Sequence, residues 1–189
     1  MTYTEECMAA AIVWRLFDAT RYSCVVNVSY GFLNHEADLI IMNGTRRLYE
    51  VEIKTTLADL KADFKKKHHH DDPKIERLFY AVPAPLLEKA QQIIPAQYGI
   101  ISVNLERCPC FNFLTAERVR EAKKLREYQL DPTQVIQLLR LGTMRYWTRR
   151  RYKSTELDIL DGVEPSKKEL QLELFDKLEE NDRKEQKHE

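Results

Sequence analysis

The feature that most constrains the fold is a pair of alternating segments joined by Asn43-Gly44. Residues 37–42 read "ADLIIM", and residues 47–54 read "RLYEVEIK". Asn-Gly between two such runs is a strong hairpin signal, and alternation with a period of two is typical of strands. The sequence therefore predicts two antiparallel strands joined by a tight turn.

The second strand of this hairpin carries charged residues at alternate positions. Successive side chains of a strand point to opposite faces, so Glu50, Glu52 and Lys54 share one face, and the apolar residues between them share the other. The apolar face supplies core packing. The charged face therefore requires a different explanation, which is either a functional site or the cross-strand charge pairs that exposed strand faces favour.

Whether Asp38 joins this charged face depends on the length of the turn. A two-residue turn would pair Asp38 with Tyr49 and place it on the wrong face. A three-residue turn over 43–45, with a bulge, would pair Asp38 with Glu50 and place it on the charged face. We predict the three-residue turn.

Asp38, Glu52 and Lys54 together suit a hard divalent cation and its chemistry. Mg²⁺ prefers oxygen ligands and often uses one or two carboxylates together with substrate phosphate. The lysine would lie beside the attacking water and would stabilise charge that builds on the phosphoryl oxygens. The residues therefore predict hydrolysis of a phosphodiester, with Asp38 and Glu52 as ligands of Mg²⁺, or of Mn²⁺ as a substitute.

The other segments predict an alternation of helices and strands. The expected order begins helix, strand, strand, strand, helix, strand, helix, strand, which is an α/β fold with a mixed sheet. Thr4 and Thr56 stand where they would cap helices. The predicted helices cover 4–18, about a dozen residues after Thr56, 84–94, 115–129 and 132–150, and the further strands cover 24–30, 76–82 and 98–104.

Composition limits the classes of function. The 189 residues include 30 Lys and Arg and 30 Asp and Glu, so the net charge is zero and any contact with nucleic acid must use a local patch. The sequence has neither the pattern of a signal peptide nor an apolar run long enough for a membrane span, so we expect a soluble, cytoplasmic protein. The last residues, from about 166 on, are mostly charged and predict a solvated helix or a disordered tail.

The cysteines and histidines give weak signals for metal. Cys7, Cys24, Cys108 and Cys110 are too few for a secreted disulfide framework, and they lack the Cys-x-x-Cys spacing of most iron–sulfur sites. We expect reduced, buried thiols. The histidines at 68–70 are more typical of a solvated loop than of a metal site.

One basic segment, "RYWTRRRYK" at 145–153, has two interpretations. Aromatic residues interleaved with cations are typical of a surface that stacks bases and neutralises phosphates. The alternative is a helix end with cations near its negative dipole and with Tyr146 and Trp147 in the core. Under the first interpretation the nucleic-acid contacts are Arg145, Arg149, Arg150 and Arg151.

Asp38 followed by Glu52-Ile53-Lys54, in the predicted order of elements, resembles the PD-(D/E)XK nuclease superfamily, whose fold is restriction-endonuclease-like with an α-β-β-β-α-β core. More narrowly, "EVEIKTTLADLKADFKKKHH", "KIERLFYAVP" and "IPAQYGIISVN" resemble the MmcB-like DNA repair protein family. Ala37 stands where the superfamily's name has proline, and three histidines stand where relatives often carry an aromatic residue.

The resemblance implies a Mg²⁺-dependent deoxyribonuclease, with DNA as its partner and a role in DNA repair. It implies that Asp38 and Glu52 bind the metal, that Lys54 is the catalytic lysine, and that Glu6 is an acidic residue near the metal. We expect a nuclease core over 1–105, a helical extension over 106–163 that packs on it, and a charged tail over 164–189. The alternatives are a nucleic-acid-binding module without turnover and an interaction protein whose tail docks a partner.

Overall fold

The structure is a computed structural model that describes residues 3–18, 20–28, 31–65, 72–107 and 112–155. The chain divides into two compact units, Met1–Thr148 and Arg149–Glu189. The first unit holds the sheet and its helices, and the last helix continues into the second. The predicted tail, 164–189, lies entirely outside the described residues.

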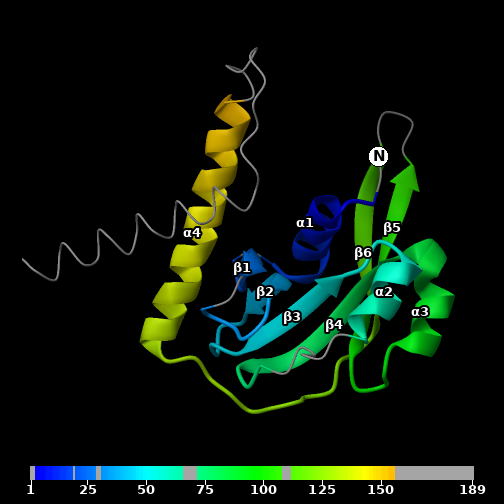
Figure 1. The fold of residues 1–189 in the computed structure, drawn as a ribbon, viewed down its shortest axis with the longest axis horizontal. Helices are drawn as coiled ribbons and strands as arrows, with labels where there is room; N and C mark the ends of the chain where they lie inside the picture. Colours follow the sequence, from blue (N-terminus) through cyan, green and yellow to red (C-terminus); the bar gives the residue numbers. More distant parts are fainter. Residues whose placement is uncertain (1–2, 19, 29–30, 66–71, 108–111, 156–189) are drawn as a thin grey trace, which may run out of the picture. The chain divides into compact units, whose positions relative to one another are not determined.

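A six-stranded mixed sheet forms the centre of the first unit (Figure 1). The strands stand in the order of the sequence: the pairs β1·β2, β2·β3 and β5·β6 are antiparallel, and the pairs β3·β4 and β4·β5 are parallel. The predicted α/β class is confirmed, and the arrangement is consistent with a restriction-endonuclease-like fold. The strands are β1 (Ser23–Val28), β2 (Ala37–Met42), β3 (Leu48–Ile53), β4 (Ile75–Pro83), β5 (Gly99–Arg107) and β6 (Asn112–Arg120).

The helices begin where the sequence supplies capping residues or proline. Thr4 Oγ1 accepts a hydrogen bond from the backbone N–H of Cys7, and Thr56 Oγ1 accepts one from that of Asp59, so both predicted caps are confirmed. No helix in the part of the chain that the structure describes is long and apolar enough to cross a membrane. The helices are α1 (Glu5–Leu16), α2 (Leu57–Asp63), the 3₁₀ turn η1 (Ala84–Leu86), α3 (Leu87–Ile93) and α4 (Pro132–Thr155).

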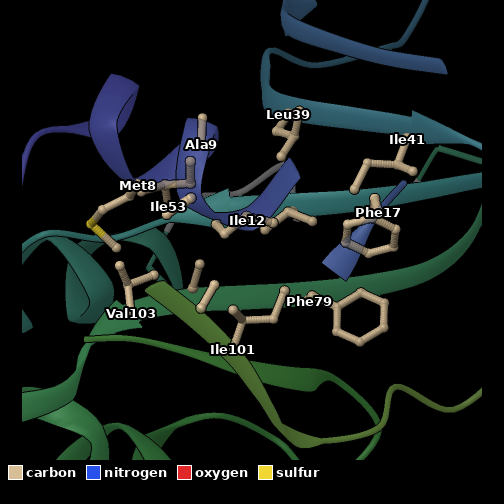
Figure 2. Close-up of a cluster of buried hydrophobic side chains, with 14 of the residues drawn as sticks. Met8, Ala9, Ile12, Phe17, Leu39, Ile41, Ile53, Phe79, Ile101 and Val103 are labelled. Atoms are coloured by element: carbon tan, nitrogen blue, oxygen red, sulfur yellow. The ribbon is translucent and has the colours of Figure 1, made fainter. Parts of the chain in front are cut away.

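Helix α1 covers one face of the sheet. Met8 and Ile12 of this helix meet apolar side chains from the alternate positions of the strands, among them Leu39, Ile53 and Ile101 (Figure 2). All of these side chains are buried. Because strand side chains alternate, the residues between these apolar positions point to the opposite face.

The opposite face has two apolar clusters with charged residues beside them. The first cluster joins Ile40 and Leu48 to Leu138 of α4, and the second joins strand β4 to α2 and α3. Along β3, Glu50 and Glu52 follow Leu48, and they pair with positions of β4 that belong to the second cluster. The charged positions of β3 are therefore enclosed by apolar packing.

The turn between β2 and β3 has three residues, as predicted, but it lies one residue later. The Arg46 N–H donates to the Asn43 carbonyl across 2.9 Å, and the Asn43 N–H donates to the Arg47 carbonyl across 3.1 Å. Residues 44–46 therefore form the loop, with Arg46 at a φ of 60°. Asn43 fixes this turn because its Oδ1 accepts hydrogen bonds from the N–H groups of Thr45 and Arg47.

This turn shifts the strand register by two residues. Ile40 pairs with Glu50, which places Asp38 opposite Glu52. The predicted pairing of Asp38 with Glu50 was therefore wrong. A shift of two residues preserves the face of each side chain, so Asp38 still lies on the charged face of the hairpin.

The helix predicted over 115–129 was wrong, because this segment begins as strand β6. Its backbone completes the sheet by pairing along β5, and Ala116 packs under α1 in the core. Arg120 ends the strand by donating hydrogen bonds to the carbonyls of Tyr98 and Pro95. Residues with high helix propensity take strand geometry here because tertiary pairing outweighs the propensity.

Residues 121–131 form an irregular connection between β6 and α4. Its backbone N–H groups at Lys123, Leu125 and Leu130 donate to carbonyls of distant loops and strands rather than to a helix of their own. Helix α4 then follows, as predicted for 132–150. Its Gly142 lies so close to Val25 that a Cβ there would stand 3.1 Å from a valine methyl.

Candidate active site

Lys54 stands at the centre of three carboxylates on the charged face. Its Nζ donates a hydrogen bond to Glu52 Oε2 across 2.7 Å. The same nitrogen lies 3.3 Å from Asp63 Oδ1 and 3.8 Å from Asp38 Oδ2. We call these four residues the Lys54 cluster.

Each member of the cluster is held by a different part of the fold. Glu52 is on β3 and Lys54 directly follows that strand, where its backbone N–H donates to the Ala81 carbonyl of β4. Asp38 is on β2, and its Oδ2 accepts the backbone N–H of Ile53 across 2.8 Å. Asp63 is the last residue of α2. The structure thus brings together the predicted Asp38, Glu52 and Lys54, and it adds a fourth residue.

Burial divides the cluster into an inner and an outer part. The side chains of Lys54, Glu52 and Asp63 are 5%, 3% and 1% exposed, whereas that of Asp38 is 27% exposed. Solvent therefore reaches the cluster on the side of Asp38. Three carboxylates against one ammonium give a net negative charge, which favours a further cation at this side.

The charge state of Lys54 follows from these neighbours. Burial alone would lower the pKa of Lys54, but the charge and the hydrogen bond of Glu52 outweigh it, and Asp38 and Asp63 add to the effect. The net result is a pKa above the usual value for lysine. Lys54 is therefore an ammonium at neutral pH and acts as a cation rather than as a base.

Asp63 was not predicted as a site residue, because its sequence pattern has two interpretations. Asp59 and Asp63 lie four residues apart on a helix with many lysines, which suits local ion pairs as well as a site. In the structure Asp63 faces the sheet, and its Oδ2 accepts a hydrogen bond from the Tyr80 hydroxyl across 3.0 Å. No local pattern could have identified this pair, because it depends on how α2 packs over β4.

The donor set of the cluster fits a hard divalent cation. Asp38 and Glu52 supply only oxygen atoms, they lie on opposite positions of neighbouring strands, and both approach the same ammonium. Among the described residues no group of three or more His, Cys, Asp or Glu side chains converges as a metal site. A cation here would therefore need other oxygen ligands, and Mg²⁺ ordinarily takes these from water and substrate phosphate.

Glu50 has a different role from the one that its position suggested. From the sequence alone Glu50 could be a third metal ligand or, more simply, a partner of an exposed Arg46 or Arg47; the second interpretation was wrong, because the side chain of Glu50 is fully buried and contacts a histidine. Glu50 Oε1 lies 2.7 Å from His35 Nε2, and Nδ1 of this histidine lies 2.8 Å from Asn34 Oδ1. Glu50 thus anchors the loop that precedes β2 and with it the strand that carries Asp38.

Glu6 lies in the first turn of α1 and is exposed. Helix α1 packs on the face of the sheet opposite to Glu52. Met8, one half-turn later, lies near Ile53 and Val103 in Figure 2, which places the start of α1 near the end of β3. The role predicted for Glu6 stays a prediction.

The basic segment of α4 is partly described. Tyr146 and Trp147 are 54% and 62% exposed, so the alternative that placed them in the core was wrong. Their rings meet edge to face with centroids 5.3 Å apart. Arg145 is half-buried. The backbone of Arg149, Arg150 and Arg151 is helical, and their side chains lie outside the described part.

The cysteines in the described part are free thiols. Cys7 and Cys24 are free, as expected, but they are half-buried rather than buried. Burial raises the pKa of the Cys24 thiol to about 11. Cys108, Cys110 and the histidines at 68–70 lie outside the described residues, so the alternatives for them stay predictions.

Comparison with known proteins identifies a family for this chain and a solved structure with a similar fold. The model of the family described as "DNA repair protein MmcB-like" matches residues 3–141. No curated protein matches the chain. Among solved structures, a protein of unknown function from Silicibacter pomeroyi superposes with a TM-score of 0.52 at 20% identity, over 85% of this chain and 97% of that one. At this identity the likeness concerns the fold alone.

Proposed function

Since the chain belongs to the MmcB-like family of DNA repair proteins, we propose that it hydrolyses phosphodiester bonds of DNA at the Lys54 cluster with the help of Mg²⁺. The observation that carries this proposal is the meeting of Asp38 and Glu52 at the Lys54 ammonium. Two carboxylates from neighbouring strands beside a buried lysine supply the two kinds of charge that phosphodiester hydrolysis needs.

The ion, when bound, would supply positive charge to the phosphoryl oxygens and to the attacking water. Asp38 and Glu52 would hold it, and Asp38 would stand on the side open to solvent and substrate. Mn²⁺ would serve as a substitute, because it accepts the same oxygen ligands.

Lys54 would act on the reacting phosphate as a fixed cation. In the hydrolysis one water attacks phosphorus, one P–O ester bond breaks, and the departing oxygen gains a proton. Negative charge builds on the phosphoryl oxygens during this step, and an ammonium held in a buried site stabilises it. The raised pKa of Lys54 supports this electrostatic role, because the side chain keeps its charge at neutral pH.

Helix α4 supports DNA as the partner. Between Pro132 and Thr155 the helix has no Asp or Glu, although the whole chain has zero net charge. Exposed aromatic rings beside cations are the composition of surfaces on which bases stack. We assign the contacts with DNA to this helix: Arg145, Arg149, Arg150 and Arg151 would neutralise phosphates, and the exposed Tyr146 and Trp147 would stack on bases.

A second candidate is a nucleic-acid-binding module without turnover. The observation that favours it is that no group of three or more potential metal ligands converges among the described residues. In this case the buried cluster would serve as an internal ion pair network, and α4 would carry the function. The two candidates differ in whether a divalent cation changes the DNA.

A cleavage assay separates the two candidates. Plasmid DNA and single-stranded DNA are incubated with the purified chain and Mg²⁺, Mn²⁺ or EDTA, alongside Glu52→Gln and the control Asp59→Asn. We expect cleavage by the wild type and by the control, no cleavage in EDTA, and a loss of about 10²- to 10³-fold in Glu52→Gln. DNA that is retained but never cut in either metal would support the binding module instead.

A further inference from the structure

Asp63 differs from the other two carboxylates of the Lys54 cluster in what its second oxygen does. Its Oδ1 faces Lys54 Nζ at 3.3 Å, and its Oδ2 accepts the Tyr80 hydroxyl at 3.0 Å. Each oxygen of the Asp63 carboxylate therefore has its own partner: the Lys54 ammonium for Oδ1 and the Tyr80 hydroxyl for Oδ2. This arrangement fixes the direction in which Asp63 presents its charge to the lysine.

The fold holds both partners of this contact rigidly. Tyr80 lies in β4, where its ring packs against Phe64 at 5.2 Å and Tyr98 at 5.8 Å between centroids. Burial, followed by the charge of Asp63, raises the pKa of Tyr80, so its hydroxyl keeps the proton that it donates. Leu60, one turn before Asp63, is buried in the apolar cluster that also contains Tyr80, and it anchors α2 on the sheet.

Lys54 and a bound cation would compete for Glu52, so Lys54 then needs a second carboxylate, which Asp63 supplies. The shortest contact of Lys54 is its hydrogen bond to Glu52, the residue that we assign to the metal. A divalent cation at Glu52 would withdraw charge from that contact and would repel the ammonium. The Lys54 ammonium has three N–H donors, so it can keep a hydrogen bond to Asp63 when Glu52 binds another cation.

We propose that Asp63, held by Tyr80, is a positioning residue that keeps the Lys54 ammonium at the reacting phosphate when a cation occupies Asp38 and Glu52. This inference deepens the proposed function and rests on it. It divides the three carboxylates into two roles: Asp38 and Glu52 serve the metal, and Asp63 serves the lysine. Asp63 itself does not touch the substrate.

The first test observes Lys54 without any reaction. In protein labelled with ¹⁵N-lysine, the buried ammonium of Lys54 gives a slowly exchanging Nζ signal, which is assigned by its loss in Lys54→Arg. With saturating Mg²⁺ present, we expect this signal to persist in the wild type and in Asp59→Asn, the control on the same helix, and to disappear in Asp63→Asn through faster hydrogen exchange. Tyr80→Phe should weaken it, and Tyr98→Phe should leave it unchanged. An unaltered signal in Asp63→Asn would overturn the proposal.

The second test uses DNA cleavage and separates positioning from mere structural support. We expect kcat to fall about 100-fold in Asp63→Asn and about tenfold in Tyr80→Phe, with KM for DNA and the Mg²⁺ dependence unchanged, because displacement of a catalytic group acts on the chemical step. Asp63→Glu should recover part of kcat. Wild-type kcat in Asp63→Asn would refute the positioning role. If the wild type itself cuts no DNA, the proposed function fails, and the Nζ signal alone then decides whether Asp63 holds Lys54.

Discussion

The backbone N–H of Ile53 donates a hydrogen bond to Asp38 Oδ2 across 2.8 Å. This bond joins the side chain of one hairpin strand to the backbone of the other, between Glu52 and Lys54. Asp38 is therefore held in place before any cation or substrate arrives. It is also the most exposed of the three carboxylates around Lys54, so it is both fixed and accessible to the cation that we propose.

Two substitutions of Asp38 should separate its structural role from its charge. Asp38→Asn keeps an acceptor for the Ile53 N–H, so we expect little change in the free energy of unfolding. Asp38→Ala removes the acceptor and should cost about 1–2 kcal/mol. Urea unfolding of both variants measures this difference. Equal stability of the two variants would show that the bond to Ile53 contributes nothing.

Removal of the Lys54 charge should destabilise the fold as well as the site. Lys54→Met leaves Glu52 and Asp63 buried without their cation, and the loss of one partner from a buried ion pair costs about 3–5 kcal/mol. Lys89→Met, an exposed control on α3, should cost almost nothing. The double variant Lys54→Met with Asp63→Asn should regain part of the loss. Thermal unfolding measures these changes in stability. If the destabilisation in the double variant equals the sum of the two single effects, Lys54 and Asp63 are not coupled.

The pair of His35 and Glu50 should behave as one unit. Both side chains are buried, and their nitrogen and oxygen lie 2.7 Å apart. We expect His35→Ala and Glu50→Gln each to cost about 1–3 kcal/mol, and the double variant to cost clearly less than the sum. A double-mutant cycle on urea unfolding gives this coupling. Independent effects would mean that the contact does not secure the loop before β2.

The aromatic pair of α4 should contribute to DNA binding. Loss of one stacking ring typically costs about 1–3 kcal/mol, so Trp147→Ala should weaken the binding of a single-stranded oligonucleotide about tenfold. Trp14→Ala is the matched control, since Trp14 is 83% exposed on α1, a helix outside this surface. Fluorescence anisotropy with a labelled oligonucleotide compares the three proteins. Equal weakening by both substitutions would argue against a specific surface on α4.

The raised pKa of Cys24 predicts that the free energy of unfolding falls at alkaline pH. The ordinary value is 9.0, and burial raises it to about 11. The folded state then holds its proton more tightly than the unfolded state, so the stability from this group is complete below about pH 9 and declines as the pH rises toward 11. The wild type should therefore lose more stability than Cys24→Ala across this range. Alkylation of Cys24, followed by peptide mass spectrometry, should likewise have a midpoint near pH 11.

Strand alternation was sufficient to predict one half of the site. It placed Glu52 and Lys54 on one face, and the choice of an odd-numbered turn added Asp38 to that face. The turn itself was displaced, because Asn43 acts as a side-chain acceptor rather than as a residue of the loop. The predicted face of Asp38 was still right, because a shift of the register by an even number of residues leaves each side chain on the same face.

The rest of the site depends on contacts between distant residues. Asp63 reaches Lys54 only because α2 packs over the sheet, and Glu50 meets His35 only because the loop before β2 folds back on β3. The strand β6 was missed for the same kind of reason. Its sequence favours a helix, and the open edge of β5 together with the cover of α1 made it a strand.

The most direct test of this account is a titration of the ¹⁵N-labelled protein with Mn²⁺, whose paramagnetism broadens the signals of nearby amides. We predict that the amides of Asp38, Ile53 and Lys54 broaden first, and that Asp38→Asn requires more than about ten times as much Mn²⁺. Broadening that is centred elsewhere, or that is unchanged in Asp38→Asn, would contradict the assignment of Asp38 and Glu52 as the ligands of a cation beside Lys54.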